Sequence, residues 1–277
     1  MTKEEILNIL INNNISDEVF SYHFTSLESG IKILFEQRLK FGNITKMNDP
    51  MEFVSPNIFF ETIKGLLSGD ERKKIEKQLF SANMRKKTSV HIISLTHIEN
   101  FLPQGNNLNK GWALSRMWAQ YARNCSGCCL IFYHNKLLDS LNSQYENDIL
   151  LHEPIEYNDD ITSFVELANL KITTDNKNND FSNFYLDDEK KRKLLFRKTK
   201  DFENEHEYRI LLIKDTSKDV SQSRELFLDV KDSIVGIILG PRVSECFYDA
   251  LSNLFKEENE IPFIYSHDWS LMQPMLK

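Results

Sequence analysis

Three glutamates at alternate positions, Glu203, Glu205 and Glu207, stand just before an apolar segment at 210–213. In an extended chain residues two apart point to the same face, so this spacing predicts a row of carboxylates at the start of a strand. Such groups titrate with shifted pKa values, bind a cation, or stabilise a positive charge that develops in a reaction. Arg209 falls on the same face and is expected to pair with a carboxylate. The alternative is an edge strand that carries cross-strand ion pairs and no ligand.

Composition sets the broad class of protein. A chain of 277 residues with 41% hydrophobic content is expected to fold as one globular domain over 1–277. Its net charge of −7 gives no global nucleic-acid-binding signature. No apolar run approaches the roughly 18 to 20 residues of a membrane span, which predicts a cytoplasmic protein without membrane contact.

The cysteines at 125 and 128 have the spacing of half a zinc site. No second Cys or His pair follows at a matching distance, so no metal site is predicted there. Small cysteines that enter a strand are typical of a buried core.

Hydrophobic spacing and cap signals predict elements of both kinds along the chain. A capping box at Thr2 and Glu5 indicates a short N-terminal helix, and another at Thr25 and Glu28 starts a second helix. Further helices are expected near 56–87, 114–121, 161–170, 186–200 and 244–256. Strands are expected near 21–24, 38–43, 90–95, 128–133, 149–157, 208–213, 225–230, 234–239 and 261–265. This order predicts an α+β fold with a mixed, largely antiparallel sheet core, surrounding helices and a C-terminal helix and strand extension.

Several short motifs occur in a fixed order between about 20 and 245. They are Tyr22-His23-Phe24-Thr25, Asn48-Asp49-Pro50-Met51-Glu52, Ile93-Ser94-Leu95, Met117-Trp118-Ala119-Gln120-Tyr121-Ala122, Gly127 to Phe132, and Glu205-His206-Glu207-Tyr208-Arg209. Together they resemble the bacterial domain-of-unknown-function family numbered 2971. That family carries no established activity.

A second, more distant resemblance is to the ADP-ribosyltransferase fold. In that fold the NAD site is built by a His or Arg on the first strand, a Ser-x-Ser or Tyr on a middle strand, and a late Glu. His23 matches the first position, Ser94-Leu95-Thr96 the second with Thr for the second Ser, and Glu205-His206-Glu207 the third. The resemblance implies NAD as co-substrate and an unknown macromolecular or small-molecule acceptor, in a toxin or defence protein.

The resemblance also implies roles for the matched carboxylates. Cleavage of nicotinamide from NAD passes through an oxocarbenium-like ribosyl cation, which a carboxylate stabilises. Either Glu207 or Glu205 suits that task, and its neighbour two positions away activates the incoming nucleophile.

The remaining matched residues are expected to contact the cofactor. His23 bonds the second ribose or the diphosphate, and Thr25 with the helix start behind it offers N–H donors to phosphate. Tyr22, Trp118 or Tyr121 stacks on the charged nicotinamide ring.

Each of these residues also has a structural interpretation. His23 fits equally well as a hydrogen-bonded core histidine, and Ser94 as a small residue tolerated in an apolar strand. Trp118 and Tyr121 share one stripe of a helix, a pattern that is typical of core packing.

Two other classes of function remain open. Asp49, Glu52, Glu205 and Glu207 could gather around Mg²⁺ in a metal-dependent nuclease or hydrolase. The same pocket could instead belong to a non-enzymatic module that senses a nucleotide or binds a partner.

Overall fold

The structure is a computed structural model that describes residues 1–44, 68–99, 110–160, 195–214, 225–256, 263–268 and 275–276. Its first part contains α1 (Lys3–Ile11), β1 (Phe20–Thr25), α2 (Leu27–Glu36), β2 (Arg38–Lys40), β3 (Gly42–Asn43), α3 (Gly69–Ser89) and β4 (Val90–Thr96). The middle part contains η3 (Gly111–Ala113), α4 (Ser115–Gln120), β5 (Cys128–Tyr133), α5 (His134–Gln144), β6 (Ile149–Pro154) and β7 (Glu156–Tyr157). The last part contains β8 (Arg197–Lys198), η5 (Lys200–Glu205), β9 (Glu207–Ile213), β10 (Phe227–Asp229), β11 (Ile234–Leu239), α8 (Glu245–Lys256), β12 (Phe263–Asp268) and β13 (Met275–Leu276).

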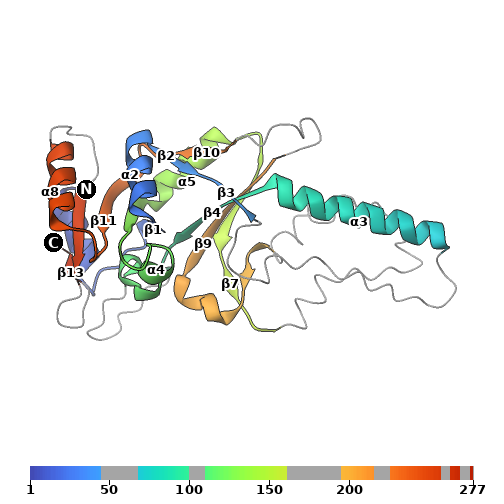
Figure 1. Cartoon of the computed structure of the whole chain (residues 1–277), viewed down its shortest axis with the longest axis horizontal. Helices are drawn as coiled ribbons and strands as arrows, with labels where there is room; N and C mark the ends of the chain where they lie inside the picture. The colour runs from blue at the N-terminus through green and yellow to red at the C-terminus, as the bar shows by residue number, and fades with distance from the viewer. Residues whose placement is uncertain are drawn as a thin grey trace.

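One large sheet organises these elements, in the strand order β13-β12-β11-β5-β1-β4-β9-β6 with β3 beside β4. The pairs of this sheet are antiparallel except β11 with β12, which run parallel. Helices pack around the sheet, and α3 projects away from it (Figure 1). The predicted α+β class with a mixed, largely antiparallel sheet is therefore confirmed.

The sheet opens between its two central strands. β1 pairs with β5 from Phe20↔Tyr133 to Thr25↔Cys128, and β4 pairs with β9 from Val90↔Ile213 to Thr96↔Glu207. β1 and β4, by contrast, are registered only at Tyr22↔Thr96 among the described residues. The two strands separate on one side of that pair, which leaves space between them.

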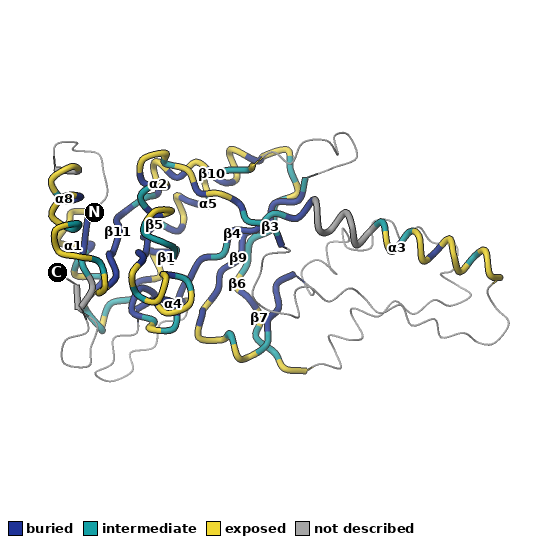
Figure 2. Tube along the Cα trace, viewed as in Figure 1, coloured by how far each residue is buried: buried dark blue, intermediate teal, exposed yellow. Residues whose placement is uncertain are grey.

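Alternating side chains divide the core into clusters on the two faces of the sheet. One face buries Leu130, Phe132, Ile210 and Leu212 against α2 and α5, and the other buries Phe20, Tyr22 and Phe24 against α1, η3 and α4. Figure 2 shows the central strands as buried, whereas much of α3 and α8 faces outward. Cys128 and Cys129 are both buried but belong to opposite clusters, so they cannot share one ligand.

Several local expectations need correction. The second helix is capped by Ser26, whose hydroxyl accepts from Ser29 N, and not by Thr25. Residues 197–198 of the helix expected over 186–200 form strand β8 instead. Helix α5 was not predicted, because it follows β5 directly and Tyr133 at its N-cap makes no side-chain cap. The motif Asn48-Asp49-Pro50-Met51-Glu52 and the helix expected at 161–170 lie outside the described residues.

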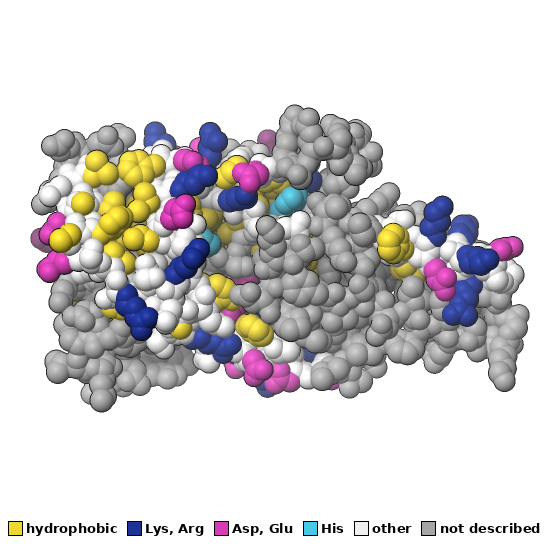
Figure 3. Space-filling model, viewed as in Figure 1, with side chains coloured by type: hydrophobic (Ala, Val, Ile, Leu, Met, Phe, Trp, Pro, Cys, Tyr) yellow, Lys and Arg dark blue, Asp and Glu magenta, His cyan; other side chains and the backbone are white. Residues whose placement is uncertain are grey.

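The visible surface mixes charges with one apolar area. Hydrophobic side chains gather over the region of α2 and α8 in Figure 3, and exposed Phe35 and Leu254 belong to these two helices. Among the described residues, no helix has the length and apolar character needed to cross a membrane.

Candidate functional site

The chain enters β9 through a tight bend that brings two glutamates together. Glu205 ends the 3-10 helix η5, His206 adopts a left-handed conformation with φ of 44°, and Glu207 begins the strand. The expected extended row that begins at Glu203 is therefore wrong, because the chain is helical up to Glu205 and Glu203 is exposed. Glu205 and Glu207 converge because His206 reverses the local direction of the backbone.

Lys198 of β8 joins these two carboxylates. Its Nζ lies 2.9 Å from Glu205 Oε2 and 2.7 Å from Glu207 Oε2, and all three side chains are almost fully buried. Sequence reasoning missed this lysine, because it falls inside the helix expected over 186–200. An ammonium between two carboxylates removes the repulsion that would otherwise separate them.

Arg209 completes the group; it lies two residues after Glu207 in β9, on the same face of the strand. Its Nε lies 2.8 Å from Glu207 Oε1 and its Nη2 3.0 Å from Glu207 Oε2, a bidentate pair. The predicted pairing of Arg209 is thus confirmed. The strand, however, lies between β4 and β6, so the edge-strand alternative is wrong. We refer to Lys198, Glu205, Glu207 and Arg209 as the charged cluster.

The charged cluster keeps Glu207 ionised. Burial by itself raises the pKa of Glu207, but the charges and hydrogen bonds of Arg209 and Lys198 outweigh it and lower the pKa from 4.5 to about 2. Glu207 is therefore a fixed anion at neutral pH and cannot donate a proton.

Ser94 and His23 connect the charged cluster to the opening in the sheet. The Ser94 hydroxyl donates to Glu207 Oε1 at 2.6 Å. His23 Nδ1 lies 3.3 Å from the Ser94 carbonyl oxygen. Because a carbonyl only accepts, Nδ1 carries the proton and Nε2 is left as an acceptor. Burial lowers the pKa of His23, which favours this neutral ring.

These groups line a pocket of about 230 Å³ where β1 and β4 separate. Its wall includes most of the residues expected at the site: Tyr22, His23, Ser94, Thr96, Tyr121, Glu205 and Glu207. Exposed Lys40 and half-buried Gly42 also border it. The structure therefore brings together motifs that lie far apart in the sequence.

The lining residues differ in how they are bonded. Tyr121 donates from its hydroxyl to Glu205 Oε1 at 2.7 Å, and Tyr22 donates to Asp17 Oδ2 at 2.6 Å, away from the charged cluster. Thr96 is buried, and its hydroxyl has no hydrogen-bond partner among the described residues.

Two of the expected contacts lie away from the pocket wall. Trp118 is fully buried in the core, where its ring packs edge-on against Phe24 and its Nε1 donates to the Trp112 carbonyl. Thr25 stands opposite Cys128 at the far end of the β1–β5 ladder. The helical stripe with Trp118 and Tyr121 correctly indicated an apolar face of the helix. Only Tyr121 reaches the pocket, however, because Trp118 is covered by the core.

The metal-site alternative finds little support in the charged cluster. Lys198 already lies between the two carboxylates that a cation would need, and Asp49 and Glu52 lie outside the described residues. Within the described part of the chain, no group of three His, Cys, Asp or Glu side chains is arranged to hold a metal ion.

A histidine cluster packs against Tyr208, on the face of β9 opposite Glu207 and Arg209. The rings of His97 and His134 stack with centroids 3.9 Å apart, and the Ser21 hydroxyl lies 2.6 Å from His134 Nδ1. Burial, together with the neighbouring His97 and His152, lowers the pKa of His134 to about 4. Because Ser21 is fully buried, this serine and histidine tie β1 to α5 and offer no nucleophile to a ligand.

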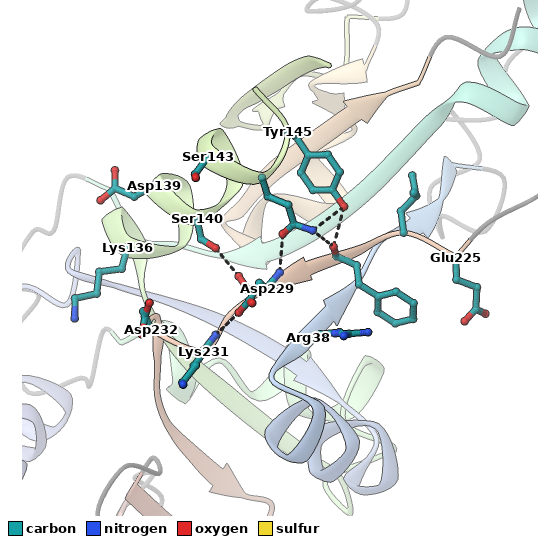
Figure 4. Close-up of a pocket in the computed structure, with 13 residues that line it drawn as sticks. Arg38, Lys136, Asp139, Ser140, Ser143, Tyr145, Glu225, Asp229, Lys231 and Asp232 are labelled. Carbon is teal, nitrogen blue, oxygen red and sulfur yellow. Dashed lines mark hydrogen bonds between the residues drawn. The ribbon is translucent and has the colours of Figure 1, made fainter. Parts of the chain in front are cut away.

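A larger hollow lies elsewhere among the described residues, a groove of about 1030 Å³ between α5 and β10. Figure 4 shows side chains of α5 turned toward the backbone of β10. Gln144 accepts from Asp229 N and donates to the Phe227 carbonyl, and Ser140 donates to the Asp229 carbonyl. These bonds satisfy the free edge of β10, while the charged residues of the groove are exposed to solvent.

Comparison with known proteins supports one of the two resemblances. Residues 117–210 match the family described as a protein of unknown function (DUF2971). The matched stretch contains Tyr121 and the whole charged cluster, whereas the pocket residues of β1 and β4 precede it. No curated protein and no solved structure matches the chain.

Proposed function

We propose that the pocket between β1 and β4 binds the nicotinamide ribose of NAD, and that the protein is an ADP-ribosyltransferase-like enzyme. The observation that carries this proposal is the hydrogen bond from Ser94 to Glu207 at a pocket that His23 also lines. A first-strand histidine, a middle-strand serine and a late glutamate are the three positions that the resemblance requires. Their convergence on one pocket supports NAD as the co-substrate.

The chemistry follows from the state of Glu207. When the bond between the ribose C1′ and the nicotinamide nitrogen breaks, nicotinamide leaves with the electron pair and a positive charge develops on the sugar. An ionised carboxylate whose position is fixed by Arg209 and Ser94 stabilises that charge without reorganising. The nucleophile then adds to C1′, and its proton passes to a base or to solvent.

The other lining groups suit recognition of this part of NAD. The free Nε2 of His23 accepts a hydrogen bond from a sugar hydroxyl, and the half-buried ring of Tyr121 offers a face to the nicotinamide. A pocket of about 230 Å³ is below the roughly 300 to 1,000 Å³ of sites that enclose whole drug-sized ligands. It therefore suits nicotinamide and its ribose, with the diphosphate passing exposed Lys40.

The acceptor is either water or a nucleophile on a macromolecule or small molecule. An NAD-consuming activity in the bacterial cytoplasm fits a toxin or a defence effector, and this role forms part of the proposal.

The proposal is tested by incubating the purified chain with NAD and measuring the release of nicotinamide. We expect release from the wild type and a loss of about tenfold or more on Ser94→Ala, which removes one bond to the carboxylate and leaves the ion pairs. Asp139→Ala, an exposed carboxylate change in the α5–β10 groove, serves as the control and should release nicotinamide at the wild-type rate. Equal rates for Ser94→Ala and the wild type would contradict the proposal.

Two further measurements distinguish this function from the two alternatives, a non-enzymatic sensor and a metal-dependent hydrolase. Thermal stabilisation by NAD without nicotinamide release, with or without added cell extract as a source of acceptors, would assign the pocket to a non-enzymatic sensor. Heat on titration with Mg²⁺ or Mn²⁺ that disappears in Glu205→Gln would favour the metal-dependent hydrolase.

A further inference from the structure

The two carboxylates of the pocket differ in their remaining capacity to accept hydrogen bonds. Glu207 Oε1 receives the Ser94 hydroxyl and Arg209 Nε, and Glu207 Oε2 receives Lys198 Nζ and Arg209 Nη2. A carboxylate offers about four lone-pair positions, so these four donors saturate it. A ligand cannot bond Glu207 directly without displacing one of them.

Glu205 retains spare acceptor capacity at the same pocket. Its Oε1 receives the Tyr121 hydroxyl and its Oε2 receives Lys198 Nζ, and no other hydrogen bond reaches it from the described residues. Each oxygen therefore keeps about one lone pair. The side chain is 2% exposed, so a donor must reach it through the pocket that it lines.

Thr96 provides a second, independent polar group. It stands opposite Glu207 in the β4–β9 ladder, is 1% exposed, and lines the pocket with a hydroxyl that bonds none of the described residues. A buried hydroxyl without a partner destabilises a fold. A ligand group that bonds it removes this cost, which favours binding over the empty pocket.

We propose that Glu205 and Thr96 form the subsite that holds the ribose hydroxyls, and that Glu207 acts on the ligand through its charge alone. This inference rests on the proposed function, because the hydroxyl pair is that of the nicotinamide ribose. Glu205 is then the residue that contacts the substrate, while Lys198 and Arg209 are positioning residues that hold the two carboxylates in place. A vicinal diol matches the subsite, since one hydroxyl donates to Glu205 and the other pairs with Thr96.

The division of roles is tested by measuring the affinity of variants for two probes, NAD and an NAD analogue that lacks both hydroxyls of the nicotinamide ribose. The wild type is expected to bind NAD more tightly than the analogue by about tenfold to hundredfold, the range of a hydrogen bond to a charged group. Glu205→Gln should lose most of this preference. Glu207→Gln, measured at a temperature where it remains folded, should retain it.

Thr96→Val supplies a readout that does not depend on activity. Because it removes an unpaired buried hydroxyl, we expect a higher melting temperature without ligand and a smaller preference for NAD over the analogue. Ser21→Ala, which removes a hydroxyl that has partners on the opposite face, is the matched control and should lower the melting temperature while keeping the preference.

The possible outcomes separate the inference from the proposed function. Full preference in Glu205→Gln and Thr96→Val, with loss of preference in Glu207→Gln, would overturn the inference and leave NAD binding intact. A wild type that binds neither probe and releases no nicotinamide would overturn the proposed function and the inference with it. A lower melting temperature of Thr96→Val would also count against the inference, because the hydroxyl would then have a structural partner.

Discussion

Two hollows within the described part of the chain, the α5–β10 groove and the β1–β4 pocket, differ in how their charged side chains are buried. The groove between α5 and β10 is the larger, but its charged side chains are exposed and its solvent-accessible polar contacts only close the edge of a strand. The pocket between β1 and β4 is several times smaller, yet it borders two buried carboxylates and a buried lysine. Buried charge is costly to maintain and needs a full set of partners. The buried polar groups, and not the volume, therefore single out the smaller pocket as the candidate site.

Loss of Arg209 should have the largest effect. Arg209→Met leaves Glu207 buried with Lys198 as its remaining cation, so the free energy of unfolding should fall by about 3 to 5 kcal/mol. Chemical denaturation measures this change. Arg209→Lys keeps the charge without the bidentate geometry, so it should recover part of the lost free energy of unfolding. A loss below about 1 kcal/mol for Arg209→Met is the size expected for an exposed ion pair, and it would contradict the contrast drawn between the charged cluster and the groove.

Acid should destabilise the pocket through Glu207. Its folded pKa of about 2 lies below its ordinary value of 4.5, so the stabilisation is complete above pH 4.5 and is lost as the pH falls towards 2. The loss amounts to roughly 3 kcal/mol. Unfolding measured between pH 6 and pH 2 should show a flatter acid limb in Glu207→Gln than in the wild type, and parallel curves would count against the ionised state of Glu207.

Loss of Gln144 tests the edge-closing function of the groove. Gln144→Ala removes two bonds to the backbone of β10, where water can replace them, so we expect a loss of about 1 kcal/mol in unfolding free energy. Hydrogen exchange at Asp229 N should become faster. Nicotinamide release, if present in the wild type, should not change, and a strong effect on it would link the groove to the pocket.

The smallest effect is expected from an exposed charge of the groove. Asp139→Ala should change the unfolding free energy by no more than about 0.5 kcal/mol, because the side chain is exposed on α5 and alanine favours helix. Thermal unfolding measures it. A change as large as that of Gln144→Ala would show that the groove is more than a solvated surface.

Sequence reasoning was most successful where the local pattern determines the secondary structure and the direction in which side chains point. Glu207 and Arg209 share a face because β9 is regular, and the apolar run at 90–95 placed Ser94 on a strand. Lys198 could not be found in this way, since its role depends on contacts with η5 and β9 that no local pattern records. Trp118 was placed at the site because a helical stripe indicates an apolar face without distinguishing a pocket from a core.

The same limit applies to the bend at His206. A left-handed conformation at a residue other than glycine is hard to predict from sequence. Here the left-handed His206 separates Glu205 from strand β9, and the Glu205 side chain pairs with Lys198. The fold class was therefore predictable from the pattern of elements. The precise geometry of the charged cluster was not, because it depends on one backbone conformation and one distant lysine.

The narrow contact between β1 and β4 divides the sheet into two parts, for which we expect different rates of amide hydrogen exchange. On one side β1, β5 and β11 form long ladders, with a register shift between Ile234 and Gly236, and on the other side β4, β9 and β6 form long ladders as well. Tyr22↔Thr96 is the registered pair that joins the two sides among the described residues. Amide groups within each part should open cooperatively, and the amides at the junction should exchange at the rate of the less stable part. A ligand that fills the pocket would contact both parts, so its binding would slow exchange across the junction and merge two cooperative units into one.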